Sequence, residues 1–293
     1  MSRLARSSIA TCLVAAICMV MLSRVVGAED FPHRTIKIVV PVPPGPLLDV
    51  VPRIVANKLS VKWNVSVIIE NRPGAAQNLG AEAVARSDPD GYTLLASPPG
   101  PLVVSGHLRT HLNFDPDAFV PVSLMVKLPT VLVINPKVTA SSLGELLAYD
   151  RANPGKLTFG SPGIGSTPHL ATEQLMKAAG IRLVHVPYQG MAPAMNDLMG
   201  GHIDMMIDLY GNVAGSIKEG KLRLLAVTTP ARLPQEPAVP TIAEIVPGFA
   251  HVEWFATVAP PKTPDAIAAK LSAAIAEILA LPDVTKRLAD LAA

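Results

Sequence analysis

The sequence predicts an α/β fold made of two domains. Strand-like apolar runs alternate with helix-patterned segments between residues 35 and 96, and the alternation returns between residues 157 and 228. Alternation at this spacing favours parallel strands joined by right-handed crossovers. A third observation is a pair of Pro/Gly loops, each following a strand, which we interpret as the facing lips of one cleft. The chain of 293 residues is long enough for two ordinary domains.

The first loop follows a strand expected at residues 35–41 and contains Pro44 and Gly45. It leads into a helix expected at residues 47–60, with Asp49 near its start. Backbone N–H groups and a helix N-terminus at the carboxyl edge of a sheet favour small anionic ligands. Asp49 is open to two interpretations, a ligand-site residue or a plain capping residue that complements the helix dipole.

The second loop lies within residues 157–169, LTFGSPGIGSTPH. A short strand leads into it and a helix follows, with Ser166 or Thr167 as the N-cap and Gly180 as the residue that stops the helix. This is the same strand–turn–helix arrangement as in the first loop. Ser97, after the third expected strand, is placed on the carboxyl edge near the first loop.

The other elements follow from apolar periodicity and from Gly and Pro stops. Further strands are expected at residues 65–70, 92–96, 131–135, 183–187, 203–207, 222–228 and 254–259. Further helices are expected at residues 80–87, 143–151, 192–199, 213–219, 264–279 and 282–291. Residues 114–121 are interpreted as irregular. The strands at 131–135 and 254–259 are interpreted as the crossings between the two domains.

The first 28 residues are expected to be a cleaved secretory signal peptide. Arg3 and Arg6 form a positive start, residues 9–22 form an apolar core, and residues 26–28 fit a small-residue cleavage site. An uncleaved membrane anchor is the alternative, but the apolar run is short for a span, which needs about 20 residues.

Composition limits the chemistry of the mature chain. Both cysteines, Cys12 and Cys18, lie in the expected signal peptide, so disulfides and cysteine-ligated metals are excluded from the mature chain. Without the three arginines of the leader the formal net charge falls from +2 to −1. Nucleic-acid binding therefore has no support from composition.

Several short motifs resemble those of enzymes or metal sites, but each lacks a residue or a context that the chemistry needs. Residues 215–221 imitate a phosphate loop but follow a helix instead of a strand. His107 and His111 have zinc-helix spacing without the general-base Glu. Ser161 sits on a strand-to-helix turn, but Phe159 stands where a nucleophile elbow needs Gly. We expect no catalysis, cofactor or metal, and a hydrolase acting through Ser161 is kept only as a remote hypothesis.

A set of motifs in a fixed order resembles one known family. The motifs are IKIVVPVPPG at 36–45, ENRPGA at 70–75, DPDGYTLL at 88–95, SPGIGS at 161–166, VPYQG at 186–190, GGHID at 200–204, PTIAE at 240–244 and PPKTP at 260–264. Together they resemble the solute-binding proteins of tripartite tricarboxylate transporters, the Bordetella uptake gene family. The likeness covers nearly the whole mature chain.

This resemblance implies a two-lobed, type II periplasmic-binding-protein-like α/β fold with two Rossmann-like domains joined by hinge strands. Domain 1 would comprise residues 29–130 and 254–293, and domain 2 residues 131–253. A periplasmic monomer would close on a small carboxylate and dock on the membrane permease subunits. The implied ligand-binding residues are Pro44, Gly45, Asp49, Ser97, Ser161, Gly163, Gly165, Ser166, His169 and Asp208.

The chain departs from the family pattern at the lips. The first has Pro46 and Leu47-Leu48 in place of Gly and a Ser/Thr pair, and the second has Pro162 and Ile164. Ala76-Gln77 replaces Gly-Gly, and the family's final strand and helix are missing, which is expected to expose apolar surface. Proline removes an N–H donor, so a more apolar cleft with a weaker anion site is expected. The alternative is a degenerate or truncated member that acts as a periplasmic interaction or sensor-accessory protein without solute affinity.

Overall fold

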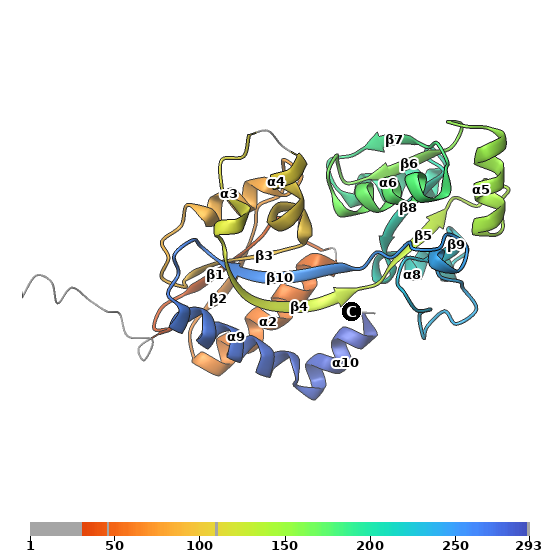
Figure 1. The fold of residues 1–293 in the computed structure, drawn as a ribbon. Helices are drawn as coiled ribbons and strands as arrows, with labels where there is room; N and C mark the ends of the chain where they lie inside the picture. Colours follow the sequence, from red (N-terminus) through yellow and green to blue (C-terminus); the bar gives the residue numbers. More distant parts are fainter. Residues whose placement is uncertain (1–30, 46, 109–110, 292–293) are drawn as a thin grey trace, which may run out of the picture.

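The computed structural model describes residues 31–45, 47–108 and 111–291, which form two lobes (Figure 1). The expected signal peptide and Pro46 lie outside these described residues. Across the described ranges, every helix is too short or too polar to cross a membrane.

The first lobe is built on a five-stranded sheet with the order β2-β1-β3-β10-β4. Its strands are β1 Ile36–Val40, β2 Val67–Asn71, β3 Thr93–Ser97, β4 Val120–Leu128 and β10 Glu253–Ala259. Its helical segments are α2 Leu47–Trp63, α3 Asn78–Ala85, η1 Gly100–Val104, α4 Ser105–Leu108, η2 Pro116–Ala118, α9 Asp265–Leu279 and α10 Pro282–Asp290. Helices α9 and α10 lie on one side of the sheet, and α3 and α4 lie on the other (Figure 1).

The second lobe is built on another five-stranded sheet, with the order β7-β6-β8-β5-β9. Its strands are β5 Thr130–Ile134, β6 Thr158–Ser161, β7 Val184–Pro187, β8 Met205–Leu209 and β9 Arg223–Val227. Its helical segments are α5 Leu143–Ala152, α6 Thr167–Ala179, α7 Met191–Gly200, α8 Tyr210–Lys218 and η3 Ile242–Glu244. Both faces of this sheet are apolar, since separate buried clusters cover them.

Both sheets are mixed, and the three strands expected to be parallel, within residues 35–96, are parallel to one another. β1 runs parallel to β2 and β3, but β10 runs antiparallel to β3 and β4. In the second sheet β5 runs antiparallel to β8 and β9. The strands that break the parallel pattern are those through which the chain passes from one lobe to the other.

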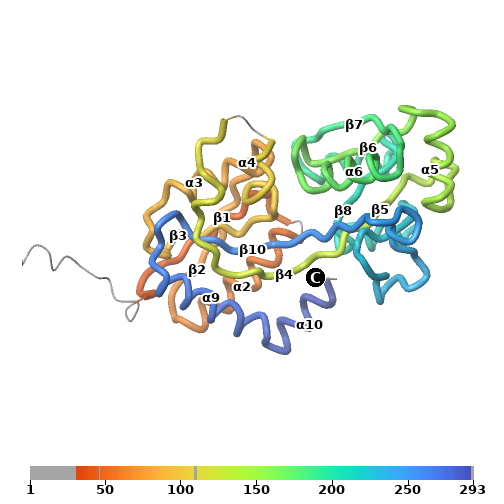
Figure 2. Tube along the Cα trace, in the orientation of Figure 1, coloured from red at the N-terminus to blue at the C-terminus, as the bar shows by residue number. Residues whose placement is uncertain are grey.

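Strand β4 is a nine-residue element that the sequence reading missed, and part of it falls in the segment interpreted as irregular. Pro121, Ser123 and Lys127 interrupt its apolar residues, so it lacks the continuous apolar run of the other strands. β4 and β10 lie side by side in the first lobe and lead toward the second (Figure 2), and β4 continues into β5 after Pro129. They form the hinge of the molecule.

The end of α10 reaches across the hinge. Val284 and Leu288 are buried in the core of the first lobe, and Leu209 of the second lobe joins the same cluster. A Cβ atom placed on Gly211 would lie 2.5 Å from the carbonyl oxygen of Leu291, so this end of the described chain touches the start of α8.

Candidate functional site

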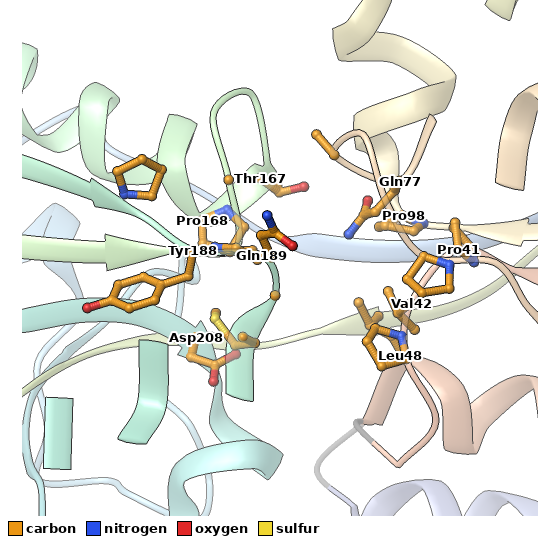
Figure 3. Close-up of a pocket in the computed structure, with 18 of the residues that line it drawn as sticks. Pro41, Val42, Leu48, Gln77, Pro98, Thr167, Pro168, Tyr188, Gln189 and Asp208 are labelled. Atoms are coloured by element: carbon orange, nitrogen blue, oxygen red, sulfur yellow. The ribbon is translucent and has the colours of Figure 1, made fainter. Parts of the chain in front are cut away.

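A cavity of about 650 Å³ lies between the lobes, with its base at the hinge. The first lobe lines it with residues 41–43, Leu48, residues 73–77 and Pro98. The second lobe lines it with residues 162–164, 167–168, 187–191, 208–209 and 212 (Figure 3). Thr130 and Glu253, the first residues of β5 and β10, contribute from the two crossings. The lining is mostly apolar with a few polar groups, as in typical small-molecule sites.

The N-terminal ends of five helices meet at this cavity. Residues from the first turn or N-cap of α2, α3, α6, α7 and α8 line it, namely Leu48, Gln77, Thr167, Met191 and Asn212. Each helix N-terminus presents backbone N–H groups and a partial positive charge of about half a unit. An anionic group in the cavity would therefore be stabilised from both lobes.

Asp49 shapes the first lip, residues 43–49, from behind. Its carboxylate is 2% exposed and accepts hydrogen bonds from the Gly45 N–H at 2.9 Å and from Arg53 Nε at 2.8 Å. Arg53 Nη2 and Asn71 Nδ2 bond the other oxygen, at 3.0 Å and 2.8 Å. Burial would raise the pKa of Asp49, but the hydrogen bonds from Arg53, Asn71 and Gly45 outweigh it and lower the pKa. The Gly45 N–H thus donates its hydrogen bond within the lip, to Asp49.

The loop before α3 has an unusual backbone. Ala75, Ala76 and Gln77 have φ angles of 50°, 51° and 75°, a conformation that is costly for residues with a Cβ atom. Two of them stand where the family resemblance expects Gly-Gly. The loop lines the cavity, and strained backbone concentrates at ligand sites.

Ser161 is the buried first residue of the second lip, residues 161–169. It is fully buried, and its Oγ is 2.7 Å from Nε2 of His185. The His185 ring stacks on Phe159 and lies 4.2 Å from the His169 ring, centroid to centroid. Burial, followed by the neighbouring His169, lowers the pKa of His185 to about 4, so that His185 is neutral at pH 7. Burial also lowers the pKa of His169.

The rest of the second lip is held by its own hydrogen bonds. Ser166 donates its hydroxyl to the Gly163 carbonyl at 2.7 Å instead of capping α6 with its side chain. The Gly165 N–H donates to Nδ1 of His169 at 3.3 Å. Gly163 and Ile164 line the cavity, and Gly163 has a φ of 129°. The lip is a preformed turn whose tip faces the first lobe.

The floor of the cavity, formed by Thr130, Asp208 and Glu253, carries two buried carboxyl groups. Asp208 is 2% exposed, and its Oδ1 accepts hydrogen bonds from the Leu209 N–H at 2.7 Å and from Asn212 Nδ2 at 3.0 Å. Its Oδ2 has no partner among the described residues. Burial raises the pKa of Asp208 to about 7, and the charge of Glu253 adds to the shift. Burial also raises the pKa of Glu253.

One hydrogen bond joins the lobes beside this floor. The Leu47 N–H at the start of α2 donates to Oδ1 of Asn212 at 3.4 Å. Asn212 thus connects the first lip to Asp208. Nearby, the hydroxyl of Thr130 bonds that of Thr228.

The structure separates the expected site residues into two groups. Gly163 and Asp208 line the cavity. The others do not line it: they are Pro44, Gly45, Asp49, Ser97, Ser161, Gly165, Ser166 and His169. Most of these support the lips, and Ser97 donates its hydroxyl to the carbonyl of Pro98, which does line the cavity.

Polar lining residues that the sequence reading missed are Gln77, Thr130, Thr167, Gln189, Asn212 and Glu253. Glu253 directly precedes the strand expected at residues 254–259, which was its signal in the sequence, whereas its burial is visible only in the structure. The Gln189 side chain lies in the cavity region opposite Gln77 of the other lobe (Figure 3). Within the described ranges, no group of three His, Cys, Asp or Glu residues is arranged to hold a metal ion.

Known proteins resemble nearly the whole described chain. A model of the family described as "Tripartite tricarboxylate transporter family receptor" matches residues 51–292. The Bordetella pertussis protein BugT is 38% identical over 257 residues, which are 87% of this chain and 79% of BugT.

Two solved structures show how far this likeness extends to the fold. An R. palustris protein solved with adipate has a TM-score of 0.85 at 34% identity, over 90% of this chain and 89% of that chain. MatC from Rhodopseudomonas palustris, solved with bound malate, has a TM-score of 0.83 at 32% identity, over 89% of this chain and 90% of that chain. The expected fold class, a two-lobed type II α/β fold, is confirmed.

Proposed function

Because the chain belongs to the tripartite tricarboxylate transporter receptor family, we propose that it is an extracytoplasmic solute-binding protein that captures a small organic acid between its lobes. The loaded protein then delivers the solute to the permease subunits of a tripartite tricarboxylate-type transporter. The proposal excludes catalysis: Ser161, the candidate nucleophile, is fully buried and does not line the cavity.

The observation that carries the proposal is the convergence of five helix N-termini on one interlobe cavity. This arrangement compensates a carboxylate without needing a basic side chain. Two similar proteins solved with adipate and with malate bind carboxylates in the same fold, which supports assigning this ligand class here.

Binding works through closure of the lobes. Residues from both lobes line the cavity, so a solute that touches both favours the closed arrangement by its differential contacts. The Leu47–Asn212 hydrogen bond across the lobes adds a small contribution to the closed arrangement. Closure would also present a composite surface of both lobes to the permease.

A thermal-shift screen of mono-, di- and tricarboxylates tests solute capture. A ligand at 100 times its Kd stabilises a folded protein by about 2.7 kcal/mol, so at least one compound should raise Tm by several degrees. Gln189→Trp should fill the cavity from an exposed lining position and abolish the shift. The matched control is Gln174→Trp, an exposed α6 position outside the cavity lining, which should preserve it.

A folded protein that responds to no carboxylate would refute solute capture. It would favour the alternative, a periplasmic interaction or sensor-accessory protein, for which the use of the Gly45 N–H by Asp49 is the supporting observation. In that case, crosslinking in cells should still find a membrane protein partner.

Export and delivery need separate measurements. Fractionation and mass spectrometry of the exported protein should place it in the periplasm with residues 1–28 removed. Uptake of the identified solute into permease-containing vesicles should require added wild-type protein and should fail with Gln189→Trp. Uptake that does not depend on the protein would refute delivery.

A further inference from the structure

Two histidine rings lie behind the second lip, outside the lining of the solute cavity. His169 on α6 and His185 on β7 are 4.2 Å apart, centroid to centroid, and both rings stack on the fully buried Phe159. Neither histidine lines the cavity. A ring packed against a second imidazole and an apolar aromatic surface is more stable in its uncharged form.

Each ring is bonded to the lip. Nδ1 of His169 accepts the Gly165 N–H at 3.3 Å, so the ring proton of neutral His169 sits on Nε2. Nε2 of His185 lies 2.7 Å from the hydroxyl oxygen of Ser161. That oxygen is in turn 3.2 Å from both the carbonyl oxygen and the amide nitrogen of Gly163, which lines the cavity. The two rings therefore hold the turn of the lip at two points.

Gly165, which bonds His169, is also a point where the lip meets the first lobe. A Cβ atom on Gly165 would lie 3.2 Å from Cδ1 of Leu108, the last residue of α4. The φ angle of Gly165 is 83°, a conformation that glycine adopts without strain. The hydrogen bond to His169 thus holds the lip in the position that contacts the opposite lobe, and its loss would disturb both that contact and the wall of the cavity.

Protonation of the rings opposes this arrangement. A protonated His169 carries a hydrogen on Nδ1, which would face the Gly165 N–H donor to donor. A charge on His185 would be repelled by a charge on the neighbouring ring. Burial lowers the pKa of both histidines, and with the added influence of His169 it lowers the pKa of His185 to about 4.

Few other charges face the two rings. Oε1 of Glu173 on α6 lies 3.6 Å from Nε2 of His169 and favours the protonated ring, but the Glu173 side chain is 46% exposed and burial outweighs it. Strand β6, which carries Phe159, has no titratable side chain, and α4 brings only the exposed His107 next to Leu108. The neutral state of the pair is therefore set mainly by its own packing.

We propose that His169 and His185 are positioning residues for the second lip, and that the cleft binds its solute tightly only while both rings are neutral. The inference rests on the proposed function, because it concerns the affinity of the same cleft. Both pKa values lie below their ordinary value of 6.5, so the lip is formed at pH 7 and loosens as the pH falls through them. Acidification thus releases the solute through two rings that do not touch it.

Substitutions that copy one ring nitrogen test the two positions. Asn at position 169 places an amide oxygen near Nδ1, and Gln at position 185 places its amide near Nε2, whereas Phe keeps the ring and removes both nitrogens. In calorimetric titrations at pH 7.5 with the carboxylate that binds wild type best, His169→Asn should bind at least about 10-fold more tightly than His169→Phe. His185→Gln should exceed His185→Phe in the same direction. The control is His202→Phe, at an exposed position outside the cavity lining, which should keep wild-type affinity.

The pH profile is the readout that a purely structural role would not change. Between pH 7.5 and pH 4.5 the wild type should lose at least about 3-fold more affinity than His169→Asn, whose amide does not titrate. Protonation of the ligand itself affects both proteins equally, so the ratio of their Kd values reports the ring. This comparison stands even if the Phe variants do not fold.

NMR of the solute-free protein gives a measurement that does not depend on binding. The Gly165 amide signal of the wild type should shift with the same midpoint as the His169 ring, and in His169→Asn it should stay constant over that pH range. A Gly165 signal that ignores the ring, or affinities of the two proteins that fall in parallel with pH, would overturn the inference and leave carboxylate capture standing. If no carboxylate binds the folded wild type, the proposed function fails and the affinity claim fails with it, while the Gly165 titration still decides whether the rings position the lip.

Discussion

Replacing Asp49 with Ala should lower the free energy of unfolding by about 2–3 kcal/mol. The buried carboxylate accepts bonds from Gly45, Arg53 and Asn71, and removing one member of a buried ion pair costs about 3–5 kcal/mol. The Arg53 side chain is 43% exposed and regains water, which reduces the cost to the lower figure. Urea unfolding followed by circular dichroism measures the change.

The matched control is Asp283→Ala. Asp283 also lies in the first turn of a helix and pairs with a lysine, Lys58, but its side chain is 64% exposed. Its replacement should leave the unfolding curve unchanged within error.

The pH dependence gives a second readout for the same substitution. Since the folded pKa of Asp49 lies below its ordinary value of 3.8, its stabilisation is present above that pH and is lost as the pH falls through the folded pKa. The difference between wild type and Asp49→Ala should therefore stay constant from pH 8 to about pH 5 and shrink below about pH 4. A difference under about 1 kcal/mol at pH 7, or one that persists unchanged at pH 2, would refute the reasoning.

Other perturbations probe the floor, the second lip and the core. Asp208→Asn should stabilise the ligand-free protein more at pH 8 than at pH 5, and the two gains should differ by at least about 1.4 kcal/mol. The reason is that burial raises the pKa of Asp208 to about 7, so the stability of the wild type falls as the pH rises from 3.8 through that value. Equal gains in denaturant unfolding at both pH values would contradict this. In an NMR titration the His185 ring should stay neutral down to pH about 4, and a midpoint near 6.5 would show that burial does not govern it. Ser161→Ala should cost about 1–2 kcal/mol in urea unfolding, because it removes the hydroxyl bonded to His185, and an unchanged midpoint would count against that bond. Gly80→Ala should lower the free energy of unfolding by about 1–3 kcal/mol, because the new Cβ would lie 2.9 Å from a neighbouring side chain and 3.2 Å from backbone atoms. The control is Gly215→Ala, whose Cβ would have nothing within 4 Å and which should be neutral or stabilising. Equal effects of the two substitutions on the free energy of unfolding would refute the packing argument.

The family resemblance drawn from the motifs is confirmed by the match over residues 51–292. The alternation of strands and helices is also present in both lobes. The expected helix stop at Gly180 is correct, since this residue has a φ angle of 64° at the end of α6, and Gly201, with a φ angle of 74°, ends α7 in the same way. These features depend on neighbours within one or two turns of the chain, which is why periodicity and Gly positions suffice to predict them.

The direction of the strands was harder to predict from the sequence than their positions. β10 and β5 run against the strands that flank them because the chain crosses between the lobes there, and no local signal encodes that path. β4 was missed because Pro121, Ser123 and Lys127 leave it without a continuous apolar run in the sequence. Tertiary packing made it a strand by pairing it with β10 along its length.

The sequence by itself located both lips, since each is a strand, a Pro/Gly turn and a helix start in direct succession. Only the tertiary structure decided which side chains face the cavity. It turned the Asp49 carboxylate inward to Arg53 and Asn71, which lies 22 residues away, and it brought Asp208 and Glu253 from different lobes' strands to one floor. The physical reason is that a side chain's partners across a fold depend on the crossing of distant segments, whereas helices, strands and turns depend on residues close together in the chain.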